Sequence, residues 1–298
     1  YIDPKNKKAL VDKKKEKYWS PVDMYVGGTE HATRHLIYAR FWHKFLFDIG
    51  AVNYKEPFSS LKNQGLIMGN DGRKMSKRWG NVVSPDDIVK ECGADSLRLY
   101  EMFMGPFDQP IPWSSKNIIG VKRFLERVFN LKSKISNLKS ESNSRLDTLL
   151  HKTIKKVTED IENFHFNTAI SSLMILLNEA EKQDLLKIEN WKLIIKLLSP
   201  FAPHMTEELW ANLGGKKSIH LEKWPLFDAS KTVENSFKLI VQIDGKTRDF
   251  FEVPTGISEE DAKDLTLKRV NVKKWVGDKH IEKTIYVPNR IINIITRS

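Results

Sequence analysis

The chain has 298 residues, of which 49 are basic and 38 acidic, so its formal net charge is +11. With 40% hydrophobic and 10% aromatic residues it can build packed cores, which excludes a chain that is disordered throughout. A single cysteine, Cys92, excludes an intrachain disulfide, and no apolar run approaches the roughly 20 residues of a membrane span. The excess of basic residues favours a polyanionic partner such as nucleic acid.

Residues 1–17 are polar and rich in lysine, which is typical of a connector. The chain starts at Tyr1, without an initiator methionine and without the apolar core of a signal peptide. We therefore expect that it begins inside a longer polypeptide. The single cysteine suits a reducing compartment, and we expect a cytoplasmic protein that contacts no membrane.

Short apolar runs alternate with helical patterns in residues 18–113. Residues 22–26 are typical of a strand that ends at paired glycines, and helical spacing begins at Thr29. Residues 65–68 form a second short apolar run before a turn signal. Ser84, followed by proline, is typical of a helix N-cap and predicts a helix that continues through Glu91. This alternation predicts part of a parallel α/β sheet.

Apolar residues recur at helical spacing throughout residues 114–213. A polar break covers residues 137–143, and Ser199-Pro200 interrupts a later helix. An antiparallel bundle of four or five helices is the economical interpretation of this region, with Trp191 and Trp210 in its core.

The pattern changes again in residues 226–298, which predict a small α+β domain. Strands at residues 238–243 and 249–253 flank an Asp244-Gly245 hairpin turn. A helix follows at residues 258–270, and two more strands, at residues 283–287 and 291–295, complete the domain. Its basic residues are of the type that contacts a nucleic-acid backbone, and we expect no aromatic stacking platform beside them.

Two lysines three positions apart, Lys74 and Lys77, flank Met75 and Ser76. On a flexible loop, such a pair can close over a polyphosphate and neutralise the charge that develops when the polyphosphate is displaced. A pair of lysines at this spacing is by itself more often a solvated basic loop. The longer run Lys74-Met75-Ser76-Lys77-Arg78 resembles the Lys-Met-Ser-Lys-Ser signature of class I aminoacyl-tRNA synthetases, with Arg78 in place of the last serine.

A second cluster of polar residues lies in residues 27–35. Paired glycines at a strand-to-helix turn permit a close backbone approach to a ligand, and a helix N-terminus favours an anion. Glu30 can accept hydrogen bonds from ribose hydroxyls, and His31 and His35 are predicted to share one helix face. The histidine pair has no third ligand at a suitable spacing, so we predict no metal site. A structural role for both rings in a core stays open.

The two clusters together resemble the bacterial-type leucyl-tRNA synthetase family, and the resemblance covers most of the chain. The segments that carry it are Tyr18-Trp19-Ser20-Pro21-Val22-Asp23, Gly27-Gly28-Thr29-Glu30-His31-Ala32, Gln64-Gly65-Leu66-Ile67-Met68, and residues 80–83, 93–98, 166–170, 200–204 and 241–246. The fold that this implies is an α/β, partial Rossmann-like catalytic domain, an α-helical anticodon-binding-type bundle and a small α+β tRNA-binding domain. Their expected bounds, after the connector at 1–17, are 18–113, 114–225 and 226–298.

The resemblance implies ATP-dependent activation of L-leucine to leucyl-adenylate and transfer of leucine to tRNA(Leu), with release of AMP and diphosphate. Lys74 and Lys77 would stabilise the leaving diphosphate, with Mg²⁺ bound to the phosphates. For ATP and adenylate, the implied residues are Gly28, Glu30, His31, Met75, Ser76 and the main chain of Leu66 and Ile67. His35 and Gln64 are implied for leucine, and Lys246 and Arg248 for tRNA.

Part of the family pattern has no counterpart in this sequence: the His-Ile-Gly-His signature, the editing domain and the zinc-binding insertion. We therefore expect a C-terminal portion that is inactive alone and acts with the missing N-terminal half, either a separate subunit or the same chain. Two alternatives remain at this point. One is a noncatalytic tRNA-binding module that keeps the loop as a scaffold, and the other is a valyl or isoleucyl relative.

Overall fold

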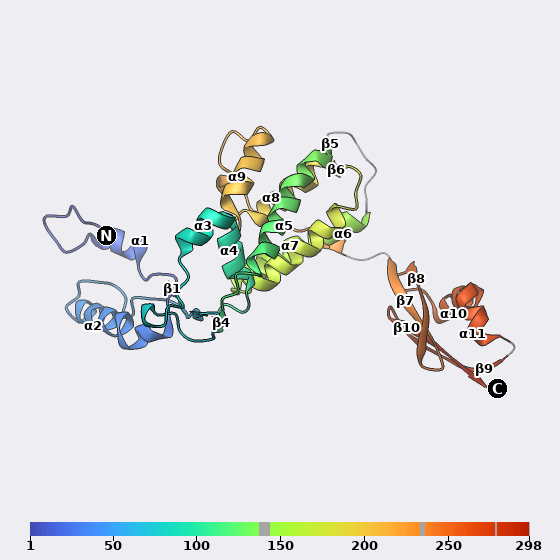
Figure 1. The fold of residues 1–298 in the computed structure, drawn as a ribbon. Coiled ribbons are helices and arrows are strands. Elements are labelled where there is room, and N and C mark those ends of the chain that lie inside the picture. The colour runs from blue at the N-terminus through green and yellow to red at the C-terminus, as the bar shows by residue number, and fades with distance from the viewer. Residues whose placement is uncertain (137–143, 233–235, 278, 298) are drawn as a thin grey trace. The chain divides into compact units, whose positions relative to one another are not determined.

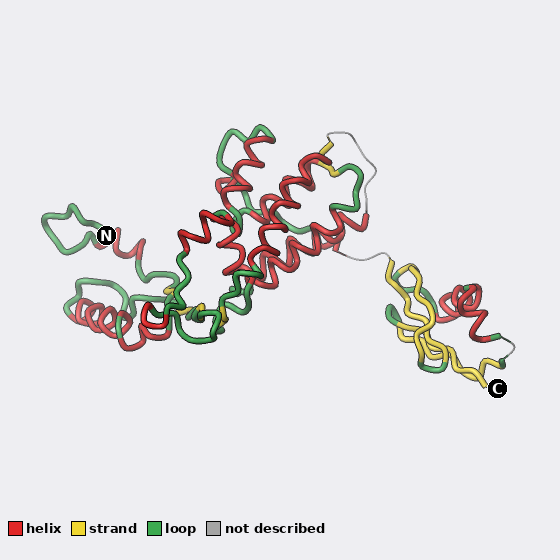
Figure 2. The backbone as a smooth tube through the Cα atoms, viewed as in Figure 1, coloured by secondary structure: helices red, strands yellow, loops and turns green. Residues whose placement is uncertain are grey.

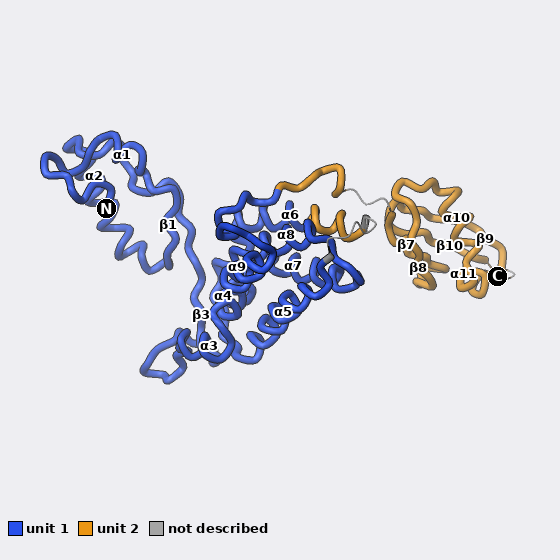
Figure 3. Tube along the Cα trace, turned by 90° about the horizontal axis from the view of Figure 1, so that it is seen from above, with its two compact units in different colours: residues 1–140, 153–225 blue, residues 141–152, 226–298 orange. Residues whose placement is uncertain are grey.

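The computed structural model describes residues 1–136, 144–232, 236–277 and 279–297, so the polar break predicted at 137–143 lies outside the described residues. The chain divides into two compact units (Figure 3). The first contains residues 1–140 and 153–225, and the second contains residues 141–152 and 226–298. In the described part of the chain, no helix combines the length and the apolar character needed to cross a membrane.

Short elements joined by long loops form the first 113 residues (Figures 1 and 2). The helices are α1 (Lys13–Trp19), α2 (His35–Asp48), α3 (Pro85–Cys92) and α4 (Ala94–Phe103), with 3₁₀ helices η1 (Thr29–Thr33) and η2 (Lys77–Trp79). The strands are β1 (Tyr25–Val26), β2 (Leu61–Lys62), β3 (Ile67–Met68) and β4 (Ile111–Pro112). β1 pairs with β2 and β3 with β4; both pairs are parallel, as expected for a parallel sheet, but each is only two residues long and the two expected strands do not pair with each other.

Two local predictions need correction. The helical segment from Thr29 is not one helix, because η1 ends in a tight turn at Arg34 (φ −127°, ψ −104°) and α2 starts afterwards. His31 and His35 therefore lie on two successive elements rather than on one helix face. The helix after Ser84 begins with Pro85 as predicted, but the Ser84 side chain makes no capping hydrogen bond.

Gly65 allows the close approach that places β3 beside β4. A Cβ atom at this position would lie only 1.9 Å from the carbonyl oxygen of Gln109, so a larger residue would force the two segments apart. The backbone N–H of Gly65 donates to the Phe107 carbonyl at 2.8 Å, and that of Ile111 donates to the Leu66 carbonyl at 3.0 Å. The strand expected to bind adenine is thus fixed along one edge.

A helical bundle follows, as the sequence predicts (Figure 1). Its elements are α5 (Ile118–Leu131), η3 (Lys132–Lys134), α6 (Ser144–Glu162), α7 (Phe166–Ala180), α8 (Ile188–Leu198), α9 (Pro203–Asn212) and η4 (Ile219–Leu221), with two-residue strands β5 (Ile135–Ser136) and β6 (Leu186–Lys187). Trp191 is fully buried and Trp210 is 9% exposed, which confirms that both belong to the core.

Helix α4 connects residues 1–113 to this bundle within the first unit. Its Leu99 and Tyr100 are 0% and 3% exposed. The Asp95 carboxylate accepts hydrogen bonds from the backbone N–H groups of His204 (3.2 Å) and Met205 (2.7 Å), which lie at the start of α9. The first N–H groups of a helix have no partner inside it, and Ala202 at the N-cap of α9 supplies none. Asp95 therefore caps α9 from another helix.

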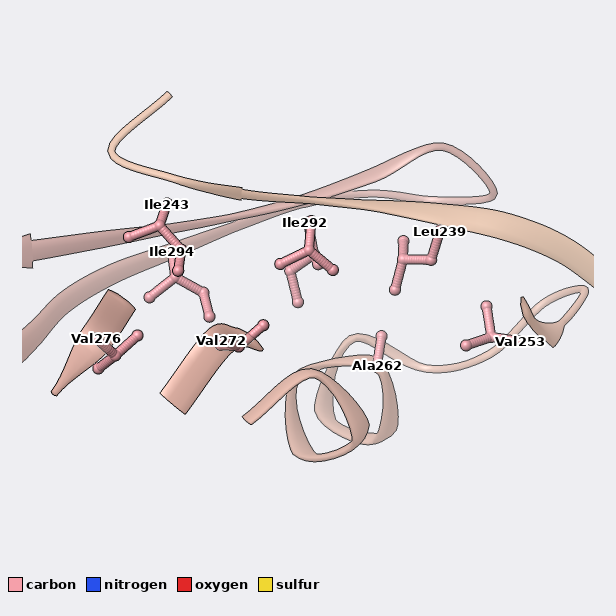
Figure 4. Packing of buried hydrophobic residues seen from close by; sticks show 9 residues of the cluster. Leu239, Ile243, Val253, Ala262, Val272, Val276, Ile292 and Ile294 are labelled. Atoms are coloured by element: carbon pink, nitrogen blue, oxygen red, sulfur yellow. The ribbon is translucent and has the colours of Figure 1, made fainter. Parts of the chain in front are cut away.

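A four-stranded sheet with two helices on one face forms the second unit. Its elements are η5 (Ala229–Thr232), β7 (Ser236–Ile243), β8 (Lys246–Pro254), α10 (Glu259–Lys268), α11 (Val270–Val276), β9 (His280–Val287) and β10 (Ile291–Arg297). The strand order is β8-β7-β10-β9, in which β7 and β10 are parallel and the outer pairs are antiparallel. Leu239 and Ile292 of the sheet face Ala262 and Val272 of the helices across the core (Figure 4).

The second unit confirms the predicted hairpin and corrects the predicted helix. Asp244 and Gly245 join β7 to β8 with φ angles of 52° and 76°, as a tight hairpin turn requires. Ser258 caps α10 by accepting a hydrogen bond from the N–H of Asp261. However, α10 ends at Lys268, and the separate helix α11 was not expected from the sequence.

We predict that Asp95→Ala lowers the free energy of unfolding of the first unit by about 1–2 kcal/mol, because two N–H groups of α9 lose their cap. Asp95→Asn, which keeps an acceptor oxygen, restores part of this loss. Chemical denaturation followed by circular dichroism measures the difference. Glu126→Ala, an exposed change on α5, is the control and leaves stability unchanged. Equal stability of Asp95→Ala and the parent would contradict the capping role.

The ion pair between Asp249 and Arg269 predicts a pH dependence in the second unit. Arg269 Nε lies 3.0 Å from Asp249 Oδ2, and this hydrogen bond holds the pKa of the Asp249 carboxyl below its usual value. A lowered folded-state pKa contributes stability above the unfolded value of about 4 and loses it as the pH falls through the folded value. We expect Asp249→Asn to destabilise the unit by about 1 kcal/mol at pH 7 and by progressively less below about pH 4.

Hydrogen exchange of the β7 and β8 amides as a function of pH measures this effect. The control is Glu252→Gln, since Glu252 pairs with Arg145 at 3.6 Å while both side chains are more than two thirds exposed. Such an exposed pair contributes little to stability, and the control should exchange like the parent. An unchanged difference between Asp249→Asn and the parent from pH 7 to pH 3 would be inconsistent with the proposed ion pair.

Candidate nucleotide-binding site

The glycine-containing segment at the start of η1 brings together the predicted polar cluster of residues 27–35. Gly28 precedes η1 with extended backbone, and a Cβ atom there would lie 2.2 Å from Oε2 of Glu30, so the Glu30 carboxylate folds over the Gly28 backbone. His35 Nδ1 and the Tyr25 hydroxyl are 2.9 Å apart. The His31 ring stands perpendicular to that of His35, with 6.3 Å between centroids. The cluster is thus assembled, although not by a single helix.

Three buried polar atoms in the first 64 residues have no hydrogen-bond partner among the described residues: Nδ1 of His31, Oδ1 of Asn63 and Oε1 of Gln64. Leaving such an atom unpaired costs about 1–3 kcal/mol, so native proteins satisfy nearly all of them. Gln64 also lines a cavity of about 260 Å³ together with Phe107 and Phe166. These atoms are suited to a polar ligand or to a further protein segment.

The main chain of β3 pairs with β4 along one edge. The Leu66 and Met68 carbonyls accept hydrogen bonds from the N–H groups of Ile111 and Trp113, at 3.0 and 2.9 Å. Because successive peptide groups of a strand point in opposite directions, the N–H and C=O of Ile67 face the other edge. Ile67 is 37% exposed. Of the two residues expected to contact adenine through the main chain, Ile67 has its N–H on the edge away from β4, whereas its C=O faces the loop segment that bridges Met68 at Lys74.

The signature loop starts directly from β3. Met68 forms an antiparallel bridge with Lys74, and the Gly69 N–H donates to the Arg73 carbonyl at 2.8 Å. Met75 lines a cavity of about 170 Å³ with Ile67 and Trp113, so it anchors the loop to the protein. Lys74 and Lys77 are exposed, and within the described ranges neither forms an ion pair. The loop therefore presents two free ammonium groups on an anchored base.

Asn81 is a structural residue of the loop that the sequence analysis did not single out. Its Oδ1 accepts a hydrogen bond from the Ser76 N–H at 2.9 Å, and its Nδ2 donates to Asp71 Oδ1 at 3.1 Å. A hydrogen bond from the Arg73 N–H, together with that from Asn81, lowers the pKa of the Asp71 carboxyl. Asn81 thus ties the two ends of the loop together. Its position directly after Gly80, in a segment of the family resemblance, was the available signal.

The structure brings β3 and the loop together but keeps the cluster at residues 27–35 apart from them. In the described chain, no hydrogen bond, ion pair or ring contact joins this cluster to Lys74 or Lys77. The reason is the division of the strands into two separate pairs, β1 with β2 and β3 with β4. In addition, α2 contains no buried residue. The part of the candidate site at residues 27–35 is therefore next to a helix, α2, that is not packed into a hydrophobic core.

The predicted tRNA-binding residues Lys246 and Arg248 both lie on β8. The Arg248 guanidinium carbon is 3.5 Å from the centroid of a Trp275 ring, and Trp275 is 45% exposed. Lys238 stacks in the same way on Phe250, which is 54% exposed. The expectation that this unit has no aromatic surface beside its basic residues is therefore wrong. Trp275 was missed because it lies on α11, the helix that the sequence did not predict.

In the part of the chain that the structure describes, no group of three or more histidine, cysteine, aspartate or glutamate side chains is placed to hold a metal ion.

Comparison with known proteins gives two family matches. The model for tRNA synthetases class I (I, L, M and V) matches residues 6–113, and the model for the anticodon-binding domain of tRNA ligase matches residues 143–263. Together they extend over both the segment that carries the signature loop and the helical bundle.

Among solved structures, the ternary complex of agnB2 LeuRS from Agrobacterium radiobacter K84 with tRNA and LeuAMS is 35% identical, with a TM-score of 0.72. The match covers 97% of this chain and 40% of that one, so this chain spans about two fifths of the LeuRS length. Mycobacterium tuberculosis methionyl-tRNA synthetase, in complex with methionyl-adenylate, shares the fold at 18% identity and a TM-score of 0.54, over 68% of this chain and 46% of that one. The chain belongs to the class I tRNA synthetases of the I, L, M and V group, and consists of a catalytic fragment followed by a helical anticodon-binding domain.

Proposed function

We propose that the chain is the C-terminal part of a cytoplasmic leucine–tRNA ligase, which activates L-leucine with ATP and transfers it to tRNA(Leu). The observation that carries this proposal is the loop from Lys74 to Lys77, anchored on β3 and Met75 with both lysines exposed and unpaired. The 35% identity to a LeuRS over nearly the whole chain supports leucine as the amino acid. The same identity gives no support to the two alternatives, a noncatalytic module and a valyl or isoleucyl relative.

In the proposed reaction, an oxygen of the leucine carboxylate forms a bond to the α-phosphorus of ATP. The bond from that phosphorus to the bridging oxygen breaks, and the electron pair leaves with diphosphate. Lys74 and Lys77 stabilise the charge that develops on the diphosphate, so they act by electrostatics and need no proton transfer. Mg²⁺, held by the phosphates themselves, supplies further neutralisation when bound.

The other side chains position the substrates. The N–H of Ile67, on the edge of β3 away from β4, suits the adenine edge, and Glu30 suits the ribose hydroxyls. Gly28, His31, Met75, Ser76 and the main chain of Leu66 complete the proposed ATP and adenylate site. His35 and Gln64 are assigned to the leucine pocket, where the unpaired Gln64 Oε1 would find its partner.

The proposed partner of α2 is the N-terminal half of the catalytic domain. One face of α2 carries five large apolar residues that are between 46% and 70% exposed: Ile37, Tyr38, Phe41, Trp42 and Phe45. The polar side of the helix is already occupied, because Arg40 and Lys44 both pair with Glu56 and lower its pKa to about 2. A contiguous apolar face of this kind marks a protein interface.

The bundle and the second unit are proposed to bind tRNA(Leu), with Lys246 and Arg248 among the contacts. Lys246 is exposed next to the β7–β8 hairpin, and Arg248 is stacked on Trp275. We propose the domain bounds expected from the sequence: 18–113 for the catalytic fragment, 114–225 for the helical bundle and 226–298 for the small α+β domain.

We predict that Lys77→Ala reduces leucine-dependent exchange of ATP and diphosphate by about 10²–10³-fold in the enzyme reassembled from both halves, because one stabilising charge is lost in the transition state. Binding of tRNA should change less than about twofold. Lys90→Ala, an exposed lysine on α3, is the control. A full exchange rate with Lys77→Ala would contradict the ligase proposal and support a noncatalytic module.

We also predict that this chain alone catalyses no leucine-dependent exchange and that Phe41→Asp prevents its assembly with the N-terminal half. A buried carboxylate in an apolar interface is costly, so the affinity should fall by at least about 100-fold. Analytical ultracentrifugation measures the assembly. Ile175→Asp, the same kind of change at a residue that is 58% exposed on α7, should assemble normally. Exchange catalysed by the isolated chain would refute the need for a partner.

A further inference from the structure

The signature loop carries more basic and aromatic side chains than the proposed diphosphate chemistry uses. Residues 69–81 contain four basic residues and one acidic residue. Lys74 and Lys77 are assigned to diphosphate, but Arg73 and Arg78 are not. Arg78 also stands where the family signature has serine, so its presence calls for a separate physical explanation.

Arg73, Arg78 and Trp79 form a group at the surface of the loop. The guanidinium carbons of Arg73 and Arg78 lie 5.3 and 5.2 Å from the centroid of the Trp79 ring. These distances are near the outer limit of a cation–π contact, about 6 Å, and the Trp79 residue stays 53% exposed. Within the described ranges, neither arginine forms an ion pair with a carboxylate. Both charges and much of the ring are therefore available to a ligand.

The local backbone holds this group in place. Trp79 is the last residue of η2, and the Ser76 hydroxyl caps this helix by accepting a hydrogen bond from the Arg78 N–H at 3.3 Å. Asn81 ties Ser76 to Asp71. The only carboxylate of residues 69–81 is thus already hydrogen-bonded, and it does not cancel the charge of the two arginines. An indole on a braced turn loses little conformational freedom when a ligand stacks on it.

We propose that Arg73, Arg78 and Trp79 form a contact site for single-stranded RNA. An unpaired base stacks on the exposed face of the Trp79 indole, and the two guanidinium groups contact the phosphates on either side of that base. Stacking on an aromatic side chain and charge contacts to the backbone are the two interactions by which proteins bind single strands. Base-paired RNA offers no free base face, and a protein partner would need a wider apolar surface than one ring.

The identity of the strand rests on the proposed function. The leucyl group passes from the adenylate to the terminal ribose at the 3′ end of tRNA, so this single-stranded end must approach the residues that bind the adenylate and diphosphate. Trp79 follows Lys77 by two positions. The site is therefore placed to contact the 3′ end of the tRNA while the lysines contact diphosphate.

Binding of a labelled six-nucleotide RNA that ends in CCA to the full chain tests this site, with fluorescence anisotropy as the readout. We expect Trp79→Ala to weaken binding about tenfold and Trp79→Phe to stay within about threefold of the parent, because phenylalanine still stacks. Arg78→Ser, which restores the residue of the family signature, should reduce the slope of log affinity against log salt concentration by about 0.7, the value for one phosphate of a single strand. Trp79→Phe should leave this slope unchanged.

Arg248→Ser is the matched control, since Arg248 is also a guanidinium stacked on an exposed indole but lies in the second unit. It should leave binding of the six-nucleotide RNA unchanged. An RNA of the same length with 4-thiouridine next to the CCA end should form a photo-cross-link in the peptide that contains Trp79, located by mass spectrometry. Equal binding by Trp79→Ala and the parent, or cross-links confined to residues 226–298, would overturn the proposal.

Binding of whole tRNA(Leu) separates this inference from the proposed function. If tRNA(Leu) binds but neither Trp79→Ala nor Arg78→Ser changes the affinity for the short RNA, only the single-strand site is refuted. If tRNA(Leu) fails to bind at all, the proposed ligase function is refuted as well. Faster tryptic cleavage at Lys74 and Lys77 in Trp79→Ala, without any change in RNA affinity, would show that the ring serves only to brace the loop, and this outcome also overturns the proposal.

Discussion

The two hydrogen bonds that Asp95 accepts from the start of α9 connect the catalytic fragment to the helical bundle. Asp95 lies in the half-buried first turn of α4, and Leu99, one turn later, is fully inaccessible to solvent. Arg98 adds a hydrogen bond to the Pro200 carbonyl at 3.0 Å. Helix α4 is therefore held both by burial and by polar contacts that are specific in direction, which fixes its rotation as well as its position.

The signature loop depends on this helix. Tyr100 of α4 packs edge-on against Trp113, with 5.0 Å between ring centroids, and its hydroxyl accepts from the Ser114 N–H. Trp113 in turn donates its backbone N–H to Met68 of β3 and lines the cavity that Met75 enters. A displacement of α4 would consequently move the strand and the loop together. Mechanical coupling between the bundle and the lysines of the loop thus has a continuous path of packed side chains.

Local patterns in the sequence were sufficient for the elements whose cause is local. The Asp244-Gly245 turn, the Ser258 cap and the apolar stripes of the bundle each depend on a few neighbouring residues, and the structure confirms them. The cap of α9 by Asp95 could not be predicted, because the partners are 109 and 110 residues apart. The break at Arg34 was also missed, since helical periodicity continues across it, and α11 was missed because the expected helix of residues 258–270 ends where α11 begins.

The same contrast applies to the candidate site, whose two parts differ in how they are supported. The loop and β3 lie against buried residues such as Trp113, whereas α2 and η1 contain no buried residue. A helix of 14 residues is marginal in water by itself, because the cost of its nucleation is repaid mainly by tertiary packing. Five apolar residues on the open face of α2 are exposed. Among the described residues, His31 Nδ1 and Gln64 Oε1 have no hydrogen-bond partner. Covering that face would supply the missing packing energy and order the residues proposed to bind adenylate at the same time. Assembly of the site and stabilisation of α2 are then one event, and the affinity for the partner half would set how much of the chain is competent to bind nucleotide.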